Sequence, residues 1–204
     1  VPVNAGGGRL IVSNGTFNAT TQLRVGFSGE GLLEVTGGTV TTPQIFLGQN
    51  ESSVAGTVPT IRQTGGLIEA TTTSSGLGVK VADNATRTCR LELDGGVFRA
   101  RRFFGAAGTA KLSANGGTVR PIAAAADFIY DFDEAKLGEK GLTVDAAYVC
   151  TVAQNFTDAD DAKGKGLLRL AGSAEKTLTG AGSTVSRIEI AGGTAKIQPA
   201  TASA

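Results

Sequence analysis

The sequence predicts an all-β protein that folds as a right-handed parallel β-helix, or β-solenoid, with about three short strands in each coil. Two observations lead to this prediction. A pair of strands joined by a glycine corner recurs along the chain with a spacing of roughly 25 residues, which is typical of repeat architectures. Glycine is also abundant, at 30 of 204 residues, as expected for many short strands joined by tight turns.

The repeated motif begins with a strand in which apolar and polar residues alternate, so that every other side chain lies on the same face. A corner of small residues and a second strand follow. Six copies can be aligned on their corners: GRLIVSNGTFNA, GLLEVTGGTVTT, PTIRQTGGLIEA, CRLELDGGVFRA, AKLSANGGTVRP and SRIEIAGGTAKI. Two further stretches, GLTVDAAYV and GLLRLAGSA, are degenerate copies that fill the gap before the last one.

The second corner residue of every aligned copy is a glycine. A corner needs a positive φ or a close approach of two backbones, and glycine allows both without a steric penalty. We therefore expect a β-branched residue at these positions to destabilise the fold. The six structural corners are Gly15, Gly38, Gly66, Gly96, Gly117 and Gly193.

Residues at fixed distances from each corner are expected to point into the core. They lie five and three residues before the corner glycine, and two residues after it. The first set is Leu10/Val12, Leu33/Val35, Ile61/Gln63, Leu91/Leu93, Leu112/Ala114 and Ile188/Ile190, and the second is Phe17, Val40, Ile68, Phe98, Val119 and Ala195. Gln63 breaks the apolar pattern, so we expect it to have a buried hydrogen-bond partner.

A third short strand follows the motif in QLRVG, QIFLG, GVKVA and RFFGA. A repeat of three short strands cannot bury its apolar face alone, and stacking of neighbouring repeats supplies the core. The alternative is an antiparallel sandwich, which predicts a turn every 8–12 residues or so. The solenoid is favoured because the repeats align in register and lack the signals of type I′ hairpins.

The chain is expected to contain a short N-terminal arm (1–8), a single β-solenoid domain (9–198) and a C-terminal tail (199–204). Residues 122–141, IAAAADFIYDFDEAKLGEKG, depart from the motif, and we expect this insert to hold a helical turn or two beside the solenoid. Neither end of the domain has an evident cap. We therefore expect the terminal coils to be covered by flanking repeats of a longer chain or by end-to-end association of copies.

Composition argues against several classes of function. Nineteen Lys and Arg residues balance 18 Asp and Glu residues, so neither a nucleic acid nor an anionic membrane surface is expected as a partner. The chain has no histidine, which excludes a Ser-His-Asp or Cys-His catalytic set. No apolar run is long enough to span a membrane. Cys89 and Cys150 are expected not to form a disulfide, because two or more coils separate them.

Two stretches of the later part of the chain carry a resemblance to a known family. They are GGTVRPIAAAADFIYDFDEAKLGEKGLTVDAAYVCTVAQNF and GLLRLAGSAEKTLTGAGSTVSRIEIAGGTAKI. The first resembles the GG-hydrophobic strand, ADF insert and strand pair in passenger segments of autotransporter-associated β-strand repeat proteins. The second resembles the next unit of that family, although the core KTGAGTL appears only as KTLTGAGSTV. The resemblance covers roughly residues 8–197. It implies a large secreted or surface-displayed bacterial β-helical protein without shared catalytic residues.

The sharpest candidate for a ligand site is the stretch RARRFF at residues 99–104. Arginine and aromatic side chains together can bind glycans and anionic sugars. Such a glycan patch would comprise Arg99, Arg101, Arg102 and Phe103. Strand alternation gives a plainer interpretation, in which Arg99 and Arg101 lie on the outer face while Phe104 fills the core.

A second candidate is the acidic stretch DADDAKGKG, residues 158–166. A calcium loop needs alternating oxygen ligands, and Ala162 occupies a position where the next ligand would be required. A solvated acidic loop is therefore favoured, and neither a metal nor a cofactor is expected.

The sequence thus favours a non-enzymatic structural module at the cell surface or outside the cell, such as an adhesin or a filament-forming subunit. The alternative is a carbohydrate-binding or polysaccharide-lyase-like β-helix module that uses the glycan patch. The expected partners are further copies or flanking repeats, with cell-surface glycans for the alternative.

Overall fold

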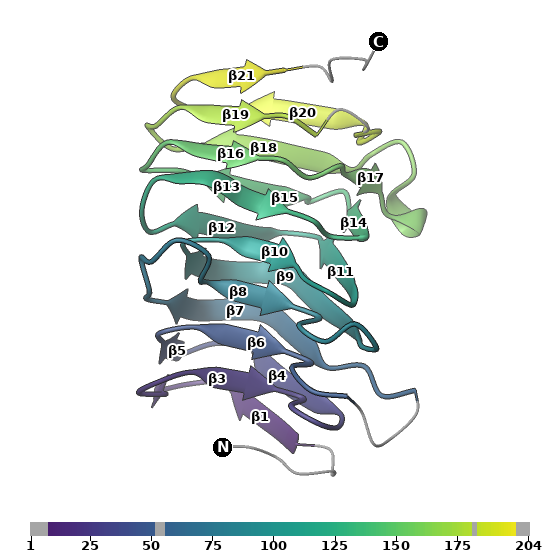
Figure 1. Cartoon of the computed structure of the whole chain (residues 1–204). Helices are drawn as coiled ribbons and strands as arrows, with labels where there is room; N and C mark the ends of the chain where they lie inside the picture. Colours follow the sequence, from purple (N-terminus) through teal and green to yellow (C-terminus); the bar gives the residue numbers. More distant parts are fainter. Residues whose placement is uncertain (1–7, 52–55, 181–182, 199–204) are drawn as a thin grey trace.

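The computed structural model describes residues 8–51, 56–180 and 183–198. The chain winds as a β-solenoid of about eight coils, and the strands β1 (Gly8–Val12) and β21 (Ala195–Ile197) lie at opposite ends of the stack (Figure 1). In Figure 1 the strands at the front run from left to right, the strands behind them run from right to left, and the chain advances from bottom to top. This winding is right-handed. The only helical segment in the described ranges is the 3-10 turn η1 (Asp160–Ala162). The predicted fold class is confirmed.

Two parallel sheets form the walls of the solenoid. The main path of sheet A contains β1, β4 (Gly31–Val35), β7 (Thr60–Ala70), β9 (Thr88–Ala100), β12 (Gly117–Pro121), β15 (Leu142–Asp145), β18 (Leu167–Ala171) and β20 (Arg187–Ile190). Beside this path lie β2 (Thr16–Asn18), β5 (Thr39–Thr42), β11 (Thr109–Ala114), β14 (Glu134–Leu137) and β17 (Thr157–Asp158). Sheet B contains β3 (Leu23–Val25), β6 (Ile45–Leu47), β8 (Val79–Val81), β10 (Phe103–Gly105), β13 (Ala125–Tyr130), β16 (Cys150–Val152), β19 (Lys176–Leu178) and β21.

Equivalent inward positions of successive coils form continuous columns along the axis. We name two of them by their first residue. The Phe17 column contains Phe17, Val40, Ile68, Phe98, Val119, Val144, Leu170 and Ile190. The Leu23 column contains Leu23, Ile45, Val79, Phe103, Ile129, Val152, Leu178 and Ile197. Both columns are apolar throughout, so neighbouring coils share one continuous core.

Gln63 lies in the core with 1% of its surface exposed, and it has the buried partners that the sequence requires. Its Nε2 donates hydrogen bonds to the backbone oxygens of Gly65, Gly66 and Val97, at 3.3, 3.2 and 3.0 Å. The amide therefore joins the glycine corner of its own coil to the backbone of the next coil. The expectation of a buried hydrogen-bond partner is confirmed.

The alignment of the last motif copy is wrong. Ile188 pairs with Leu168 and Ile190 pairs with Leu170, so β20 continues the strands that follow the glycine corner and not those that precede it. Ile188 and Ile190 are also 40% and 53% exposed, and are not core residues of the isolated chain. The error has a physical cause: alternating apolar residues occur on both sides of the corner, so periodicity alone does not distinguish the two halves.

The insert at residues 122–141 forms strands and not the expected helical turns. It contains all of β13 and β14, which pair with strands of the coils on either side. Phe128 and Phe132 are buried, which places this segment in the wall of the solenoid. Alanine and acidic residues suggested a helix, but pairing with neighbouring strands overrides that local preference.

The predicted boundaries fall close to the ends of the described chain. Gly8, the last residue of the predicted arm, begins β1, and the rest of the arm and the tail at 199–204 lie outside the described residues. Cys89 in β9 and Cys150 in β16 belong to different sheets, and both are free and buried.

Candidate functional site

Four of the six predicted corner glycines form a stack of left-handed turns. Gly15, Gly38, Gly66 and Gly96 have φ values of +72°, +67°, +66° and +72°. A Cβ added to Gly96 would lie 2.6 Å from the carbonyl carbon and oxygen of Gly65 in the coil below. A Cβ on Gly15 would meet nothing within 4 Å. The corners therefore pack backbone against backbone, and only Gly15 has open space in this direction.

Gly117 and Gly193 differ from the other four. Gly117 occupies the position above Gly96 in the next coil, but its φ is not positive. A Cβ on Gly117 would lie 2.7 Å from the Cβ of Leu93. Gly193 has a φ of +63° and lies at a different corner, between β20 and β21. The structure thus assigns three kinds of environment to the six predicted corners.

Sequence reasoning missed the buried polar side chains that hold the other corners. Lys176 is fully buried, and its Nζ donates to the backbone oxygens of Ala171, Gly172 and Gly192 at 2.9, 3.0 and 2.7 Å. In the preceding coil, the amide of Gln154 donates to the carbonyl of Phe132 and accepts from its N–H. A lysine between Glu175 and Thr177 gives no sequence signal for this role.

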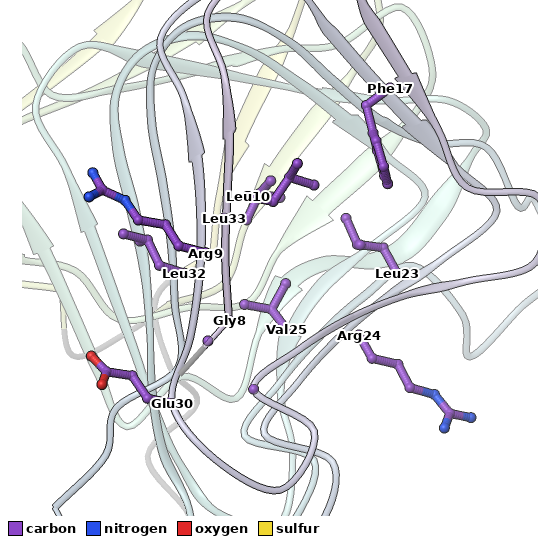
Figure 2. A pocket seen from close by; sticks show the side chains of 12 residues that line it. Gly8, Arg9, Leu10, Phe17, Leu23, Arg24, Val25, Glu30, Leu32 and Leu33 are labelled. Carbon is purple, nitrogen blue, oxygen red and sulfur yellow. The ribbon is translucent and has the colours of Figure 1, made fainter. Parts of the chain in front are cut away.

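The N-terminal end of the solenoid is hollow. A cavity of about 270 Å³ opens there, and its apolar lining includes Leu10, Phe17, Leu23, Val25 and Leu33. Figure 2 shows these side chains directed toward one another from the strands of the first coils, while the charged groups at the rim point away. The first members of both apolar columns, Phe17 and Leu23, therefore line this hollow, although Leu23 is only 7% exposed.

The C-terminal end exposes the last members of the same columns. Ile190 and Ile197 are 53% and 56% exposed. In coils further inside the stack, the equivalent residues Leu170 and Val152 are completely buried. Within the described ranges, no strand pairs with the outer edges of β20 and β21. Each end of the stack thus presents a strand edge beside apolar side chains.

The predicted glycan patch does not assemble on one face. Arg99 lies outside sheet A and pairs with Glu69 at 3.1 Å. Phe103 is 1% exposed and belongs to the Leu23 column, where its ring packs edge-on against Phe98 with centroids 4.9 Å apart. Phe103 therefore fills the core position that strand alternation had assigned to Phe104. A ligand on the outer face could not contact it.

The outer face of sheet B instead carries a short aromatic stack next to Arg102. The rings of Phe104 and Tyr130 are 5.3 Å apart and almost parallel. Burial raises the pKa of Tyr130, and the neighbouring Arg102 guanidinium partly opposes this rise. Arg102 also approaches Asp127 at 4.0 Å, and its side chain is only 15% exposed. The remaining patch residue, Arg101, is half-buried in the turn before β10. Phe104 is itself nearly buried, so this stack mainly joins two coils.

A charged cleft of about 200 Å³ lies on the outer face of sheet A, over β9, β11 and β14. The sequence analysis did not predict it. Its lining includes Arg90, Glu92, Lys111 and Glu134. Glu92 accepts from Arg62 at 2.8 Å, and Glu134 pairs with Lys111 at 3.1 Å, which lowers the pKa of Glu134. Arg90 has no ion-pair partner among the described residues. It lies beside Lys111 in the ladder, so two cationic side chains are neighbours in the cleft.

The acidic stretch at residues 158–166 is organised around Asp158. This carboxylate accepts hydrogen bonds from the backbone N–H groups of Gly164 and Ser186 and from the Ser186 hydroxyl, and these bonds lower its pKa. Asp160 pairs with Lys136 at 2.9 Å. The described residues contain no group of three or more side chains placed to hold a metal ion.

Comparison with known proteins identifies no relative: no family model, no curated protein and no solved structure matches the chain. The resemblance to autotransporter-associated repeats therefore stays a prediction. Among the described segments, none is a helix of sufficient length and apolar character to cross a membrane.

Proposed function

We propose that this chain is a non-enzymatic structural module of an extracellular or cell-surface bacterial protein, an adhesin or a filament-forming subunit. Its terminal coils pair with further coils. The observation that carries the proposal is made on the described residues: an apolar hollow lies at one end of the stack, and Ile190 and Ile197 are exposed at the other. Solenoid repeats need a neighbour or a cap at each end, and open strand edges are templates for further strands.

The outer surface supports a scaffold role. Ion pairs join one coil to the next at Arg9–Glu34, Arg62–Glu92 and Arg169–Glu189, with separations of 2.6, 2.8 and 2.9 Å. Exposed pairs of this kind add little stability. They favour the observed register, because a shifted register would place like charges opposite each other. The surface location rests on the family resemblance, and digestion of intact source cells with an external protease would test it.

A tandem fusion of two copies tests whether the ends accept coils. The stretch between the last strand of one copy and the first of the next would be about as long as the existing connection between β6 and β7. If the ends pair, the fusion unfolds as one unit and at a higher temperature than the single chain, because the junction buries apolar surface. Two copies that melt independently at the midpoint of the single chain would contradict the proposal.

A matched pair of variants localises this effect. Ile190→Lys in the first copy places a charge at the junction, whereas the same change in the second copy places it at the free end. We expect only the first variant to lose the gain in melting temperature, since burying an unpaired ammonium is strongly unfavourable. The two variants have identical compositions, so other effects of the substitution cancel.

A second candidate function has one specific observation in its favour, the unpaired Arg90 beside Lys111 in the charged cleft. This arrangement suits the carboxylate of an anionic polysaccharide. Titration with polygalacturonate at low salt would test it. Arg90→Ala should then weaken binding at least fivefold, while Arg9→Ala, outside the cleft, should not. Equal binding by both variants would remove this candidate.

A further inference from the structure

The two apolar columns give the ends of the molecule a common register. Ile190 and Phe17 are the terminal members of the Phe17 column, and Ile197 and Leu23 are the terminal members of the Leu23 column. All strand pairs in both columns are parallel, so the strands at the two ends run in the same direction. A second copy moved along the axis would therefore continue both sheets without a reversal of strand direction.

We propose that the partner of each end is a second copy of this chain, stacked head to tail, with Ile190 against Phe17 and Ile197 against Leu23. This inference rests on the proposed function, which requires only that the ends accept coils. The hollow receives the two isoleucines, which lose their exposure, and both columns continue from one molecule into the next. Burial of apolar surface and new backbone hydrogen bonds between strands drive the association.

The outward residues are compatible with this register. The residue before Ile190 is Glu189, and it would lie opposite Thr16; the residue before Ile197 is Lys196, and it would lie opposite Gln22. Neither position brings like charges together, which would oppose strand pairing. Gly15, next to Thr16, has open space where a Cβ would point, so its corner does not obstruct an added coil.

This contact is heterologous, because it joins two different surfaces of the chain. A head-to-tail contact related by translation along the axis does not close on itself, and it produces an open filament. The end face is a small part of the surface. We therefore expect filament length to increase with protein concentration, without a fixed oligomeric state.

Cysteine cross-linking tests the register directly. In the stacked arrangement, Thr16→Cys lies opposite Glu189→Cys on sheet A, and Gln22→Cys lies opposite Lys196→Cys on sheet B. Mild oxidation of either double variant should give a series of covalent multimers on a non-reducing gel. Crossed combinations, Thr16→Cys with Lys196→Cys and Gln22→Cys with Glu189→Cys, place the thiols on different sheets and should remain monomeric.

The parent chain provides the background for this experiment. Cys89 and Cys150 are buried, and their burial raises both thiol pKa values to about 11, so they should not react. Multimers of equal yield from matched and crossed variants would overturn the proposed register. Monomer from every variant, at protein concentrations up to the millimolar range, would overturn stacking of copies.

A pair of isoleucine substitutions checks the same interface without cross-linking. Ile190 and Ile11 are similarly exposed, at 53% and 51%, but Ile11 lies on the outward side of β1, opposite Glu34. Ile190→Lys should weaken association measured by sedimentation velocity at least tenfold, and Ile11→Lys should leave it unchanged. Equal effects would overturn the proposal.

The outcomes separate this inference from the proposed function. If the tandem fusion gains stability while single chains neither cross-link nor associate, the ends accept coils but not those of a free second copy. Flanking repeats of a longer chain would then be the partners. If the tandem fusion also fails, both proposals are wrong.

Discussion

The lower coils, from β1 to β10, and the upper coils, from β14 to β21, surround the same apolar columns but turn their corners differently. In the lower coils, glycines such as Gly38, Gly66 and Gly96 stack directly on one another with positive φ. In the upper coils, buried polar side chains such as Lys176 and Gln154 bind the free carbonyls of the turns. The regions thus differ in emphasis: a row of left-handed glycines runs through four successive lower coils, where Gln63 also binds corner carbonyls, whereas Lys176 and Gln154 serve individual turns of the upper coils.

This difference explains why the repeat is visible only in part of the sequence. A stacked glycine corner constrains the coil above and below, because an added Cβ would meet backbone atoms of its neighbour. The same residue type must therefore recur at the same position in each coil. The Lys176 side chain binds carbonyls of its own turn and that of Gly192 in the next coil, but it contacts only backbone oxygens there and so does not require the same residue type to recur. Each region should respond differently to substitution.

The largest expected effect is at the glycine corners. Gly96→Ala would force a Cβ to within 2.6 Å of the Gly65 backbone at a φ of +72°, and we expect the free energy of unfolding to fall by about 3 kcal/mol or more. Gly15→Ala has the same φ but no neighbouring atoms, so it should cost only about 1 kcal/mol. Urea denaturation of both variants measures the difference. Equal losses would mean that close backbone contact is not what requires glycine.

Lys176→Met is the corresponding test in the upper coils. It leaves three buried carbonyls without a donor, and it also removes a buried charge, so we expect a net loss of roughly 3 kcal/mol. Lys196→Met removes an exposed lysine that pairs with Glu175, and it should cost about 0.5 kcal/mol at most. Thermal melts of both variants compare them. A neutral Lys176→Met would show that these turns do not depend on the ammonium group.

The two thiols test whether both regions exclude water equally. Burial raises the pKa of Cys89 in the lower coils and of Cys150 in the upper coils from 9.0 to about 11. The folded state keeps the thiol proton after the unfolded state has lost it, so stability should fall as the pH rises from 9 to 11. The expected loss is about 2–3 kcal/mol for each thiol. Cys89→Ala and Cys150→Ala should each flatten the measured pH dependence by the same amount, and a difference between them would identify the wetter region.

The smallest expected effect is at Asp131, an exposed residue of the middle coil with a φ of +58°. Gly26 and Gly48 have φ values of +64° and +61° after the equivalent sheet B strands of the lower coils. Asp131→Gly should relieve the strain of a left-handed aspartate and stabilise the protein by about 0.5 kcal/mol after the entropic cost of glycine. The melting temperature should rise by roughly 1–2 °C, whereas Asp131→Ala should give no rise.

The sequence was sufficient to predict the fold where backbone geometry repeats. Alternating apolar residues and glycine corners identified the strands of the lower coils and the buried amide of Gln63. They placed the strand of Ile190 before a glycine corner and not after it, because strands on both sides of the corner have the same alternation. The charged cleft and the Lys176 site were also missed, since each joins residues from different coils that only the register of stacking brings together. Phe103 and Phe104 could not be distinguished, because both are aromatic and a shift of one residue exchanges inside and outside.

The strands lie across the axis of the stack, and this orientation determines how the molecule would respond to tension. Because β1 and β21 lie at opposite ends, a force pulling them apart acts along the hydrogen bonds between coils (Figure 1). Hydrogen bonds loaded in this direction break a few at a time. They do not share the force, as they would if neighbouring strands were pulled past one another along their length. Each coil that detaches releases its whole contour length before the next is loaded. Under load, the protein would therefore behave as an extensible tether that yields in steps at low force and dissipates work over a long extension.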